Sequence, residues 1–183
     1  MATAKQQANV RVATPLLHLP NASSTAEVVL NKAIEFCADK MGLESPQTAI
    51  ARLQKAEQKA CTYCHYSIAE QVAAALGALD EHIKAVYMFE DDATPEDVCF
   101  SEAPGVPLLH LLVWTERKTE ALKSLVTMLD RALAQSYGQL IGPRQLQHLL
   151  DVQAIDDADV EKRVGYGALL HSIHFRPLKV WEH

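Results

Sequence analysis

The sequence predicts an α/β (α+β) fold, in which two N-terminal helices precede a small mixed sheet of about four strands backed by a long helix. Through residues 24–79, apolar residues recur at three- and four-residue spacing, which is typical of helices that bury one face. After Asp80, short runs rich in β-branched and aromatic residues alternate with helical patterns. We therefore expect a tail over residues 1–23, a helical region over 24–79 and an α/β domain over 80–183.

Start and stop signals place the two N-terminal helices. The four residues from Ser24 have the pattern of a capping box, which predicts a first helix from Ser24, and Gly42 is expected to end it. Ser45, which is followed by proline, predicts the start of a second helix whose apolar stripe continues to about Leu79. Because a helix of roughly 30 residues would be ~45 Å long, we expect a break within it, near residues 63–67.

The second half of the chain alternates strands with helices. Its most apolar and β-branched runs predict four strands, the second of them central, at residues 83–89, 108–115, 149–155 and 178–181. An amphipathic pattern predicts a long helix over residues 119–140. Short helices are expected to start at Thr94 and at Asp156, and a further one to cover residues 166–173.

Composition and charge exclude several classes of partner. The net charge of −6, with scattered basic residues, argues against a nucleic-acid surface. No run approaches the ~20 apolar residues of a membrane span, and the first ten residues lack the apolar stretch of a signal peptide. We expect a cytoplasmic protein whose four cysteines are free thiols. Because Ala-rich amphipathic helices pair readily, we also expect a homo-oligomer.

A cysteine-rich segment is the first candidate site. Cys61, Cys64 and His65 form C-x-x-C-H, the attachment pattern of c-type haem, but haem is attached in exported proteins. On a helix these three side chains share a face, and Cys37 would complete a set of zinc ligands. A redox pair would require the motif at a helix start, where the thiol pKa falls. The alternative interpretation is a pair of small thiols packed in the core.

The order of elements after Asp80 resembles the nucleotidyltransferase domain of the polymerase-beta superfamily. The resemblance covers about residues 70–183, and the apolar pattern of 169–173 followed by 178–182 is similar to that family's closing helix and strand. In the family, a Gly-Ser turn after the first strand cradles the nucleotide phosphates. A D-x-D pair on the second strand holds two divalent ions, and a third carboxylate follows on a later strand.

Most of that motif is replaced in this chain. Glu90 and Asp91 stand where the family has Gly-Ser, and two carboxylates would repel a triphosphate. Leu108 and His110 stand where the D-x-D pair would be, although Mg²⁺ prefers oxygen ligands to imidazole. Asp151 alone matches a family carboxylate, and two-metal chemistry needs several oxygen ligands. The resemblance therefore implies an inactive or divergent member.

The remaining carboxylates leave a metal centre open as an alternative. Glu90, Asp91 and Asp92 would meet Asp151 across the end of the sheet and, with His110, form the magnesium centre of a divergent transferase. The simpler interpretation is a solvated acidic turn and a hydrogen-bonded strand carboxylate. We expect a binding or scaffold module without transferase activity and without a cofactor. Its small-molecule ligand is not indicated by the sequence, and a zinc or redox module is the third alternative.

Overall fold

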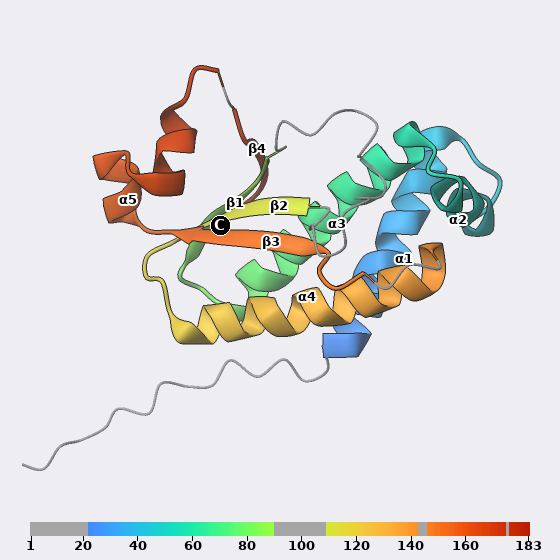
Figure 1. The fold of residues 1–183 in the computed structure, drawn as a ribbon, viewed down its shortest axis with the longest axis horizontal. Coiled ribbons are helices and arrows are strands. Elements are labelled where there is room, and N and C mark those ends of the chain that lie inside the picture. The colour runs from blue at the N-terminus through green and yellow to red at the C-terminus, as the bar shows by residue number, and fades with distance from the viewer. Residues whose placement is uncertain (1–21, 90–108, 143–145, 175) are drawn as a thin grey trace, which may run out of the picture.

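The computed structural model describes residues 22–89, 109–142, 146–174 and 176–183, and it confirms the α/β class (Figure 1). In chain order the elements are α1 (Ala22–Met41), α2 (Pro46–Gln54), α3 (Gln58–Leu79), β1 (Ile83–Phe89), β2 (Leu109–Thr115), α4 (Glu120–Ile141), β3 (Leu150–Ile155), α5 (Asp157–Lys162), the 3₁₀ helix η2 (Gly165–His171) and β4 (Leu178–Glu182). The helix start expected at Thr94 lies outside the described residues.

The four strands form one mixed sheet in the order β3-β2-β1-β4. β1 runs antiparallel to both β2 and β4, whereas β2 and β3 are parallel. The second strand is therefore central, as predicted. This topology brings the end of β1 beside the starts of β2 and β3, which is the end of the sheet that carries the candidate residues.

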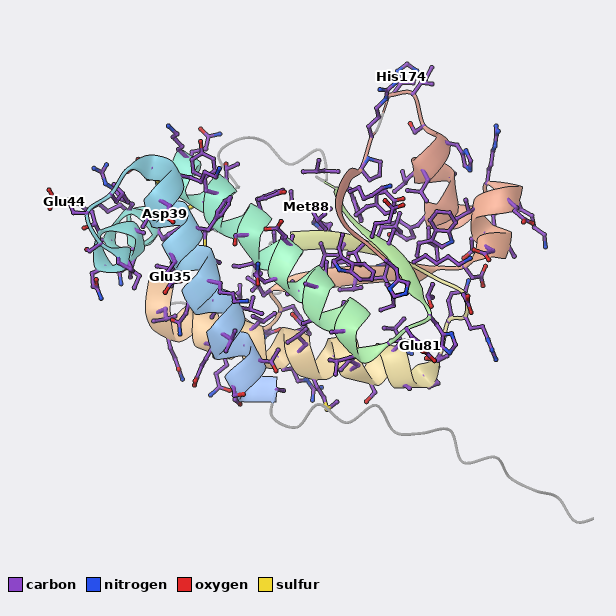
Figure 2. The ribbon with its side chains drawn as sticks, turned by 180° about the vertical axis from the view of Figure 1, so that it is seen from behind. Glu35, Asp39, Glu44, Glu81, Met88 and His174 are labelled. Atoms are coloured by element: carbon purple, nitrogen blue, oxygen red, sulfur yellow. The ribbon has the colours of Figure 1, made fainter. Side chains whose placement is uncertain are left out.

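Helices α3 and α4 cover one face of the sheet and α1 packs against both helices, and Figure 2 shows α3 crossing the sheet. One continuous core joins Leu30 of α1, Leu76 of α3 and Leu129 of α4 to the alternate residues of β2 that face them. The ring of Trp181 in β4 lies against α3 at Gly77, where a Cβ atom would overlap it. The N-terminal helices and the sheet thus share their hydrophobic interior.

The opposite face of the sheet is smaller and is bordered by α5 and η2. On β2 this face carries His110, Leu112 and Trp114, and Leu112 is buried although it lies outside the main core. η2 contacts β3 from this side, and Figure 1 shows α5 at the end of the molecule opposite to α2. In the described part of the chain, none of the helices has the length and apolar content needed to cross a bilayer.

The break in the second helical region lies earlier than expected. Residues 63–67 are continuous helix inside α3, and the chain breaks between α2 and α3, where Ala56 adopts a φ of 55°. The N–H groups of Ala56 and Glu57 bond to Leu53 O and Arg52 O at 2.9 and 3.1 Å, the C-terminal pattern in which glycine is usual. Because alanine stands in that position, the sequence carries no glycine to mark the break.

The start of the first helix also differs from the prediction. Ser24 lies inside α1, not at its N-cap, because Ala22 and Ser23 are already helical. Alanine is the residue that costs least in a helix, and serine is tolerated there. Gly42 ends the helix as predicted, with a φ of 63° that glycine adopts without strain.

Candidate functional site

His110 and Asp151, the two predicted catalytic candidates, lie side by side at one end of the sheet. The strand register pairs Phe89 with His110 and His110 with Asp151, and we call these three residues the cross-strand row. His110 Nδ1 lies 3.1 Å from Asp151 Oδ2. The parallel pairing of β2 with β3 creates this contact, because it sets the second residue of one strand beside the second residue of the other.

Both carboxylate oxygens of Asp151 have partners from the sheet itself. While His110 contacts Oδ2, Gln153 Nε2 donates a hydrogen bond of 2.8 Å to Oδ1, since residues two apart on a strand share a face. The side chains of His110 and Asp151 are 18% and 31% exposed. Asp151 is therefore a satisfied carboxylate that orients an imidazole.

Aromatic rings border this pair. The Phe89 ring lies 5.4 Å from the His110 ring and 6.1 Å from the ring of Tyr166, centroid to centroid. Tyr166 comes from η2, which corresponds to the short helix expected over residues 166–173, but the sequence did not indicate its contact with Phe89. Its glycine neighbour Gly167 explains the placement, because a Cβ atom there would meet the backbone of Asp159 in α5.

The structure does not describe the acidic turn that would complete a metal centre. Glu90, Asp91 and Asp92, together with Leu108, lie outside the described residues. Among the residues that the structure does describe, no group of three or more His, Cys, Asp or Glu side chains is placed to hold a metal ion.

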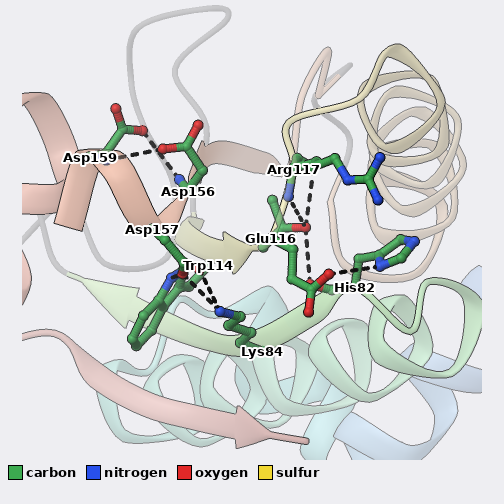
Figure 3. Close-up of polar contacts among 9 residues, drawn as sticks. His82, Lys84, Trp114, Glu116, Arg117, Asp156, Asp157 and Asp159 are labelled. Atoms are coloured by element: carbon green, nitrogen blue, oxygen red, sulfur yellow. Dashed lines mark hydrogen bonds and ion pairs between the residues drawn. The ribbon is translucent and has the colours of Figure 1, made fainter. Parts of the chain in front are cut away.

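A second polar cluster, which the sequence did not reveal, lies at the other end of the same face (Figure 3). Lys84 Nζ donates to Asp157 at 2.8 and 2.7 Å, and Trp114 Nε1 donates to the same carboxylate at 2.8 Å. Lys84 also lies 5.7 Å from the centroid of the Trp114 ring. The hydrogen bonds from Lys84 and then from Trp114 lower the pKa of Asp157.

Lys118 makes a similar attachment from the loop before α4. Its Nζ lies 2.7 Å from Asp159 Oδ2 and 3.3 Å from Asp156 Oδ2. The hydrogen bond between Lys118 and Asp159 raises the pKa of the lysine and lowers that of the carboxyl. Asp156 and Asp159 also form the capping box of α5 (Figure 3), so the helix start predicted at Asp156 is confirmed.

A buried carboxylate determines where β3 begins. Asp130 in α4 accepts the N–H groups of Leu149 and Leu150 at 2.8 Å each on one oxygen. Its other oxygen lies 2.7 Å from His148 Nδ1. Because β3 starts at Leu150, Asp130 helps to place Asp151 in the cross-strand row.

The C-x-x-C-H residues lie in α3. The ring of His65 is buried and its Nε2 lies 3.1 Å from the hydroxyl of Tyr137, and burial lowers its pKa to about 4. Cys64 is a free thiol whose pKa burial raises to about 12, which disfavours the thiolate that a metal or a redox reaction needs.

The other two cysteines of this region differ in state. Cys37 is free, and its Sγ lies 3.4 Å from Ala60 O. Cys61 is disulfide-bonded, so the expectation of a free thiol is wrong for this residue. Pairing depends on which thiols the fold brings within bonding distance, and spacing along the chain does not reveal that.

A scan against protein-family models gave no match, and searches of curated proteins and of solved structures gave no significant match. The basis for a functional proposal is therefore the chemistry of the cross-strand row and its surroundings.

Proposed function

We propose that the chain is a nucleotidyltransferase-like binding or scaffold module that does not transfer nucleotides. The supporting observation is the contact between His110 and Asp151, at the end of the sheet where such a transferase would hold its metal ions. The single carboxylate that matches the family is bonded on both oxygens, to an imidazole and to the amide of Gln153.

The residue types in the cross-strand row favour binding over metal-dependent transfer. Phosphoryl chemistry with two ions needs several oxygen ligands, and an imidazole is a poor substitute for a carboxylate around Mg²⁺. Phe89, His110 and the nearby Tyr166 instead offer rings beside a few oriented polar groups. Aromatic side chains with a few placed polar groups are the residue types that commonly line sites for small organic ligands.

A transfer assay tests this proposal. The full chain is incubated with each of the four α-³²P-labelled nucleoside triphosphates and Mg²⁺ or Mn²⁺, and compared with Asp151→Asn and with the exposed control Asp39→Asn. We expect no labelled product from any of the three proteins. Metal-dependent transfer by the natural chain that disappears in Asp151→Asn and persists in Asp39→Asn would refute the proposal.

An active, divergent metal-dependent transferase is the second candidate, and one observation supports it, the position of Asp151 beside His110 Nδ1. A carboxylate beside Nδ1 orients an imidazole so that Nε2 can accept a proton, which is how a general base is positioned. This candidate predicts that ATP raises the melting temperature only when Mg²⁺ is present, and that Asp151→Asn removes the effect. Stabilisation by ATP that is independent of Mg²⁺ would favour the binding module, and light scattering would test the expected homodimer.

A further inference from the structure

Residues 156–171, which we call the cap, contain α5 and η2 and lie outside the main core. No residue of α5 is buried, and Gly167 is the buried residue of η2. The core cluster of the described residues, including the side chains packed against it, contains none of the cap. α5 and η2 contact each other across a turn in which Arg163 and Gly165 have φ values of 54° and 51°. The cap is thus a compact unit whose residues lie outside the main core.

Two lysines attach this unit to the sheet side of the molecule. Lys84 of β1 bonds Asp157 together with Trp114, as Figure 3 shows. Lys118 bonds Asp159. The side chains of Lys84 and Asp157 are 37% and 47% exposed, and that of Lys118 is 45% exposed. Partly exposed ion pairs of this kind are individually weak and are screened by salt.

The cap also touches the cross-strand row. The ring centroids of Tyr166 and Phe89 lie 6.1 Å apart, and η2 contacts β3, the strand that carries Asp151. A movement of the cap away from the sheet would therefore remove a neighbour of Phe89 and increase the exposure of the groups beside it.

We propose that the cap is a displaceable cover of the cross-strand row, held closed by Lys84 and Lys118, and that its opening gives a ligand access to His110 and Asp151. This regulation rests on the proposed function, in which the row is the binding surface. The structural basis is a polar attachment on one side of the cap and an aromatic contact with the row on the other.

Hydrogen exchange of the full chain, followed by mass spectrometry, tests whether the cap opens. The double variant Lys84→Met/Lys118→Met removes both attachments and leaves the capping box of α5 intact. We expect amide exchange in residues 157–171 to accelerate about fivefold, while exchange in β2 stays unchanged. The matched control is Arg52→Met, which removes a comparably exposed ion pair with Glu57 at 2.7 Å, far from the cap.

Modification by diethyl pyrocarbonate, read peptide by peptide, tests whether opening uncovers the row. In the double variant His110 is expected to react several-fold faster, whereas His148, whose side chain is already 50% exposed, keeps its rate. If the double variant does not fold, the natural chain at about 0.05 M and 1 M NaCl supplies the same comparison, because salt screens the two ion pairs.

Two results would overturn the cap proposal. One is exchange of residues 157–171 that occurs only together with β2, since the cap would then open only by global unfolding. The other is faster exchange in the cap without faster modification of His110, since the cap would then not cover the row. Neither readout uses a nucleotide, so nucleotide transfer by the natural chain would refute the proposed function without deciding whether the cap opens and uncovers His110.

Discussion

Asp130 shows how one buried side chain positions a strand. It is 5% exposed and bonds two consecutive backbone N–H groups, those of Leu149 and Leu150, at the point where β3 begins. Its carboxylate supplies the hydrogen-bond acceptor that these N–H groups would otherwise have in water or in a neighbouring strand. The residue carries no recognisable motif, and its importance follows only from what the fold places opposite it.

Replacing Asp130 with alanine is expected to destabilise the protein by about 3 kcal/mol, because two buried N–H groups lose their acceptor. Asp130→Asn is expected to cost less, since an amide oxygen still accepts hydrogen bonds. Urea unfolding followed by circular dichroism measures both, with the exposed Asp39→Ala as control. A loss in Asp130→Ala no larger than in the control would show that the carboxylate does not hold β3.

His65 makes the stability of the fold sensitive to acid. Its folded pKa of about 4 lies below the ordinary value of 6.5, so between these values the unfolded chain binds the proton and the folded chain does not. Stability is therefore lost as pH falls from about 6.5 towards about 4. From pH 7.5 to pH 4.5 this loss amounts to about 2.5 kcal/mol.

The test compares the natural chain with His65→Gln by urea unfolding at both pH values. The difference between the two proteins isolates His65, because the shifted carboxyls Asp157 and Asp159 contribute equally to both. Their lowered pKa values remove stability only at still lower pH. Equal pH dependence of the two proteins would show that His65 is not a buried neutral group.

At the scale of elements, the junction between α2 and α3 places an alanine in a backbone conformation that glycine usually occupies. Ala56 has a φ of 55°, a region that alanine adopts at a cost and glycine adopts freely. The geometry is retained because Leu53 is buried beneath it and Arg52 bonds Glu57 at 2.7 Å. The same junction explains why the helix break was expected in the wrong place.

Ala56→Gly is expected to raise the free energy of unfolding by about 0.5–1 kcal/mol, because it relieves the left-handed backbone. The matched change Ala51→Gly, at an exposed position inside α2, is expected to lower it by a similar amount. Thermal unfolding of the two variants measures the opposite signs. A decrease in both would contradict the assignment of the junction.

At the scale of the whole molecule, the helical region and the sheet are expected to unfold together. The core joins α1, α3 and α4 to β1 and β2, so neither part buries its apolar face alone. Both tryptophans of the chain, Trp114 and Trp181, lie in the sheet, whereas most of the helix signal comes from α1, α3 and α4. The two parts therefore have separate spectroscopic reporters.

Urea unfolding followed by tryptophan fluorescence and by far-ultraviolet circular dichroism is expected to give the same midpoint within error, since one core implies one cooperative transition. A separation of the two curves, with fluorescence changing first, would show that the sheet unfolds independently of the helices.

Local signals predicted most elements of the second half to within a residue or two. β1 was expected at residues 83–89 and spans Ile83–Phe89, and the long helix expected at 119–140 spans Glu120–Ile141 with Thr119 as its N-cap. Periodicity and capping residues are properties of consecutive positions, so they are visible in sequence. The break at Ala56 was missed because an alanine, and not a glycine, has the left-handed φ there.

The candidate site was predictable in part. His110 and Asp151 were identified as residues, but their contact depends on the parallel register of β2 with β3. Tyr166 and the attachments of the cap to Lys84 and Lys118 gave no sequence signal, because their partners lie tens of residues away along the chain.

By itself, the sequence determined the α/β class, the order of the strands along the chain and the chemical character of the residues near the ends of β1, β2 and β3, because periodicity and residue type are local. The tertiary structure alone decided the strand order β3-β2-β1-β4, the pairing of His110 with Asp151 and the position of the cap. These features depend on contacts of apolar faces and buried charges with residues that are distant along the chain. Such residues become neighbours only in the folded structure, so their pairing is not visible in the sequence.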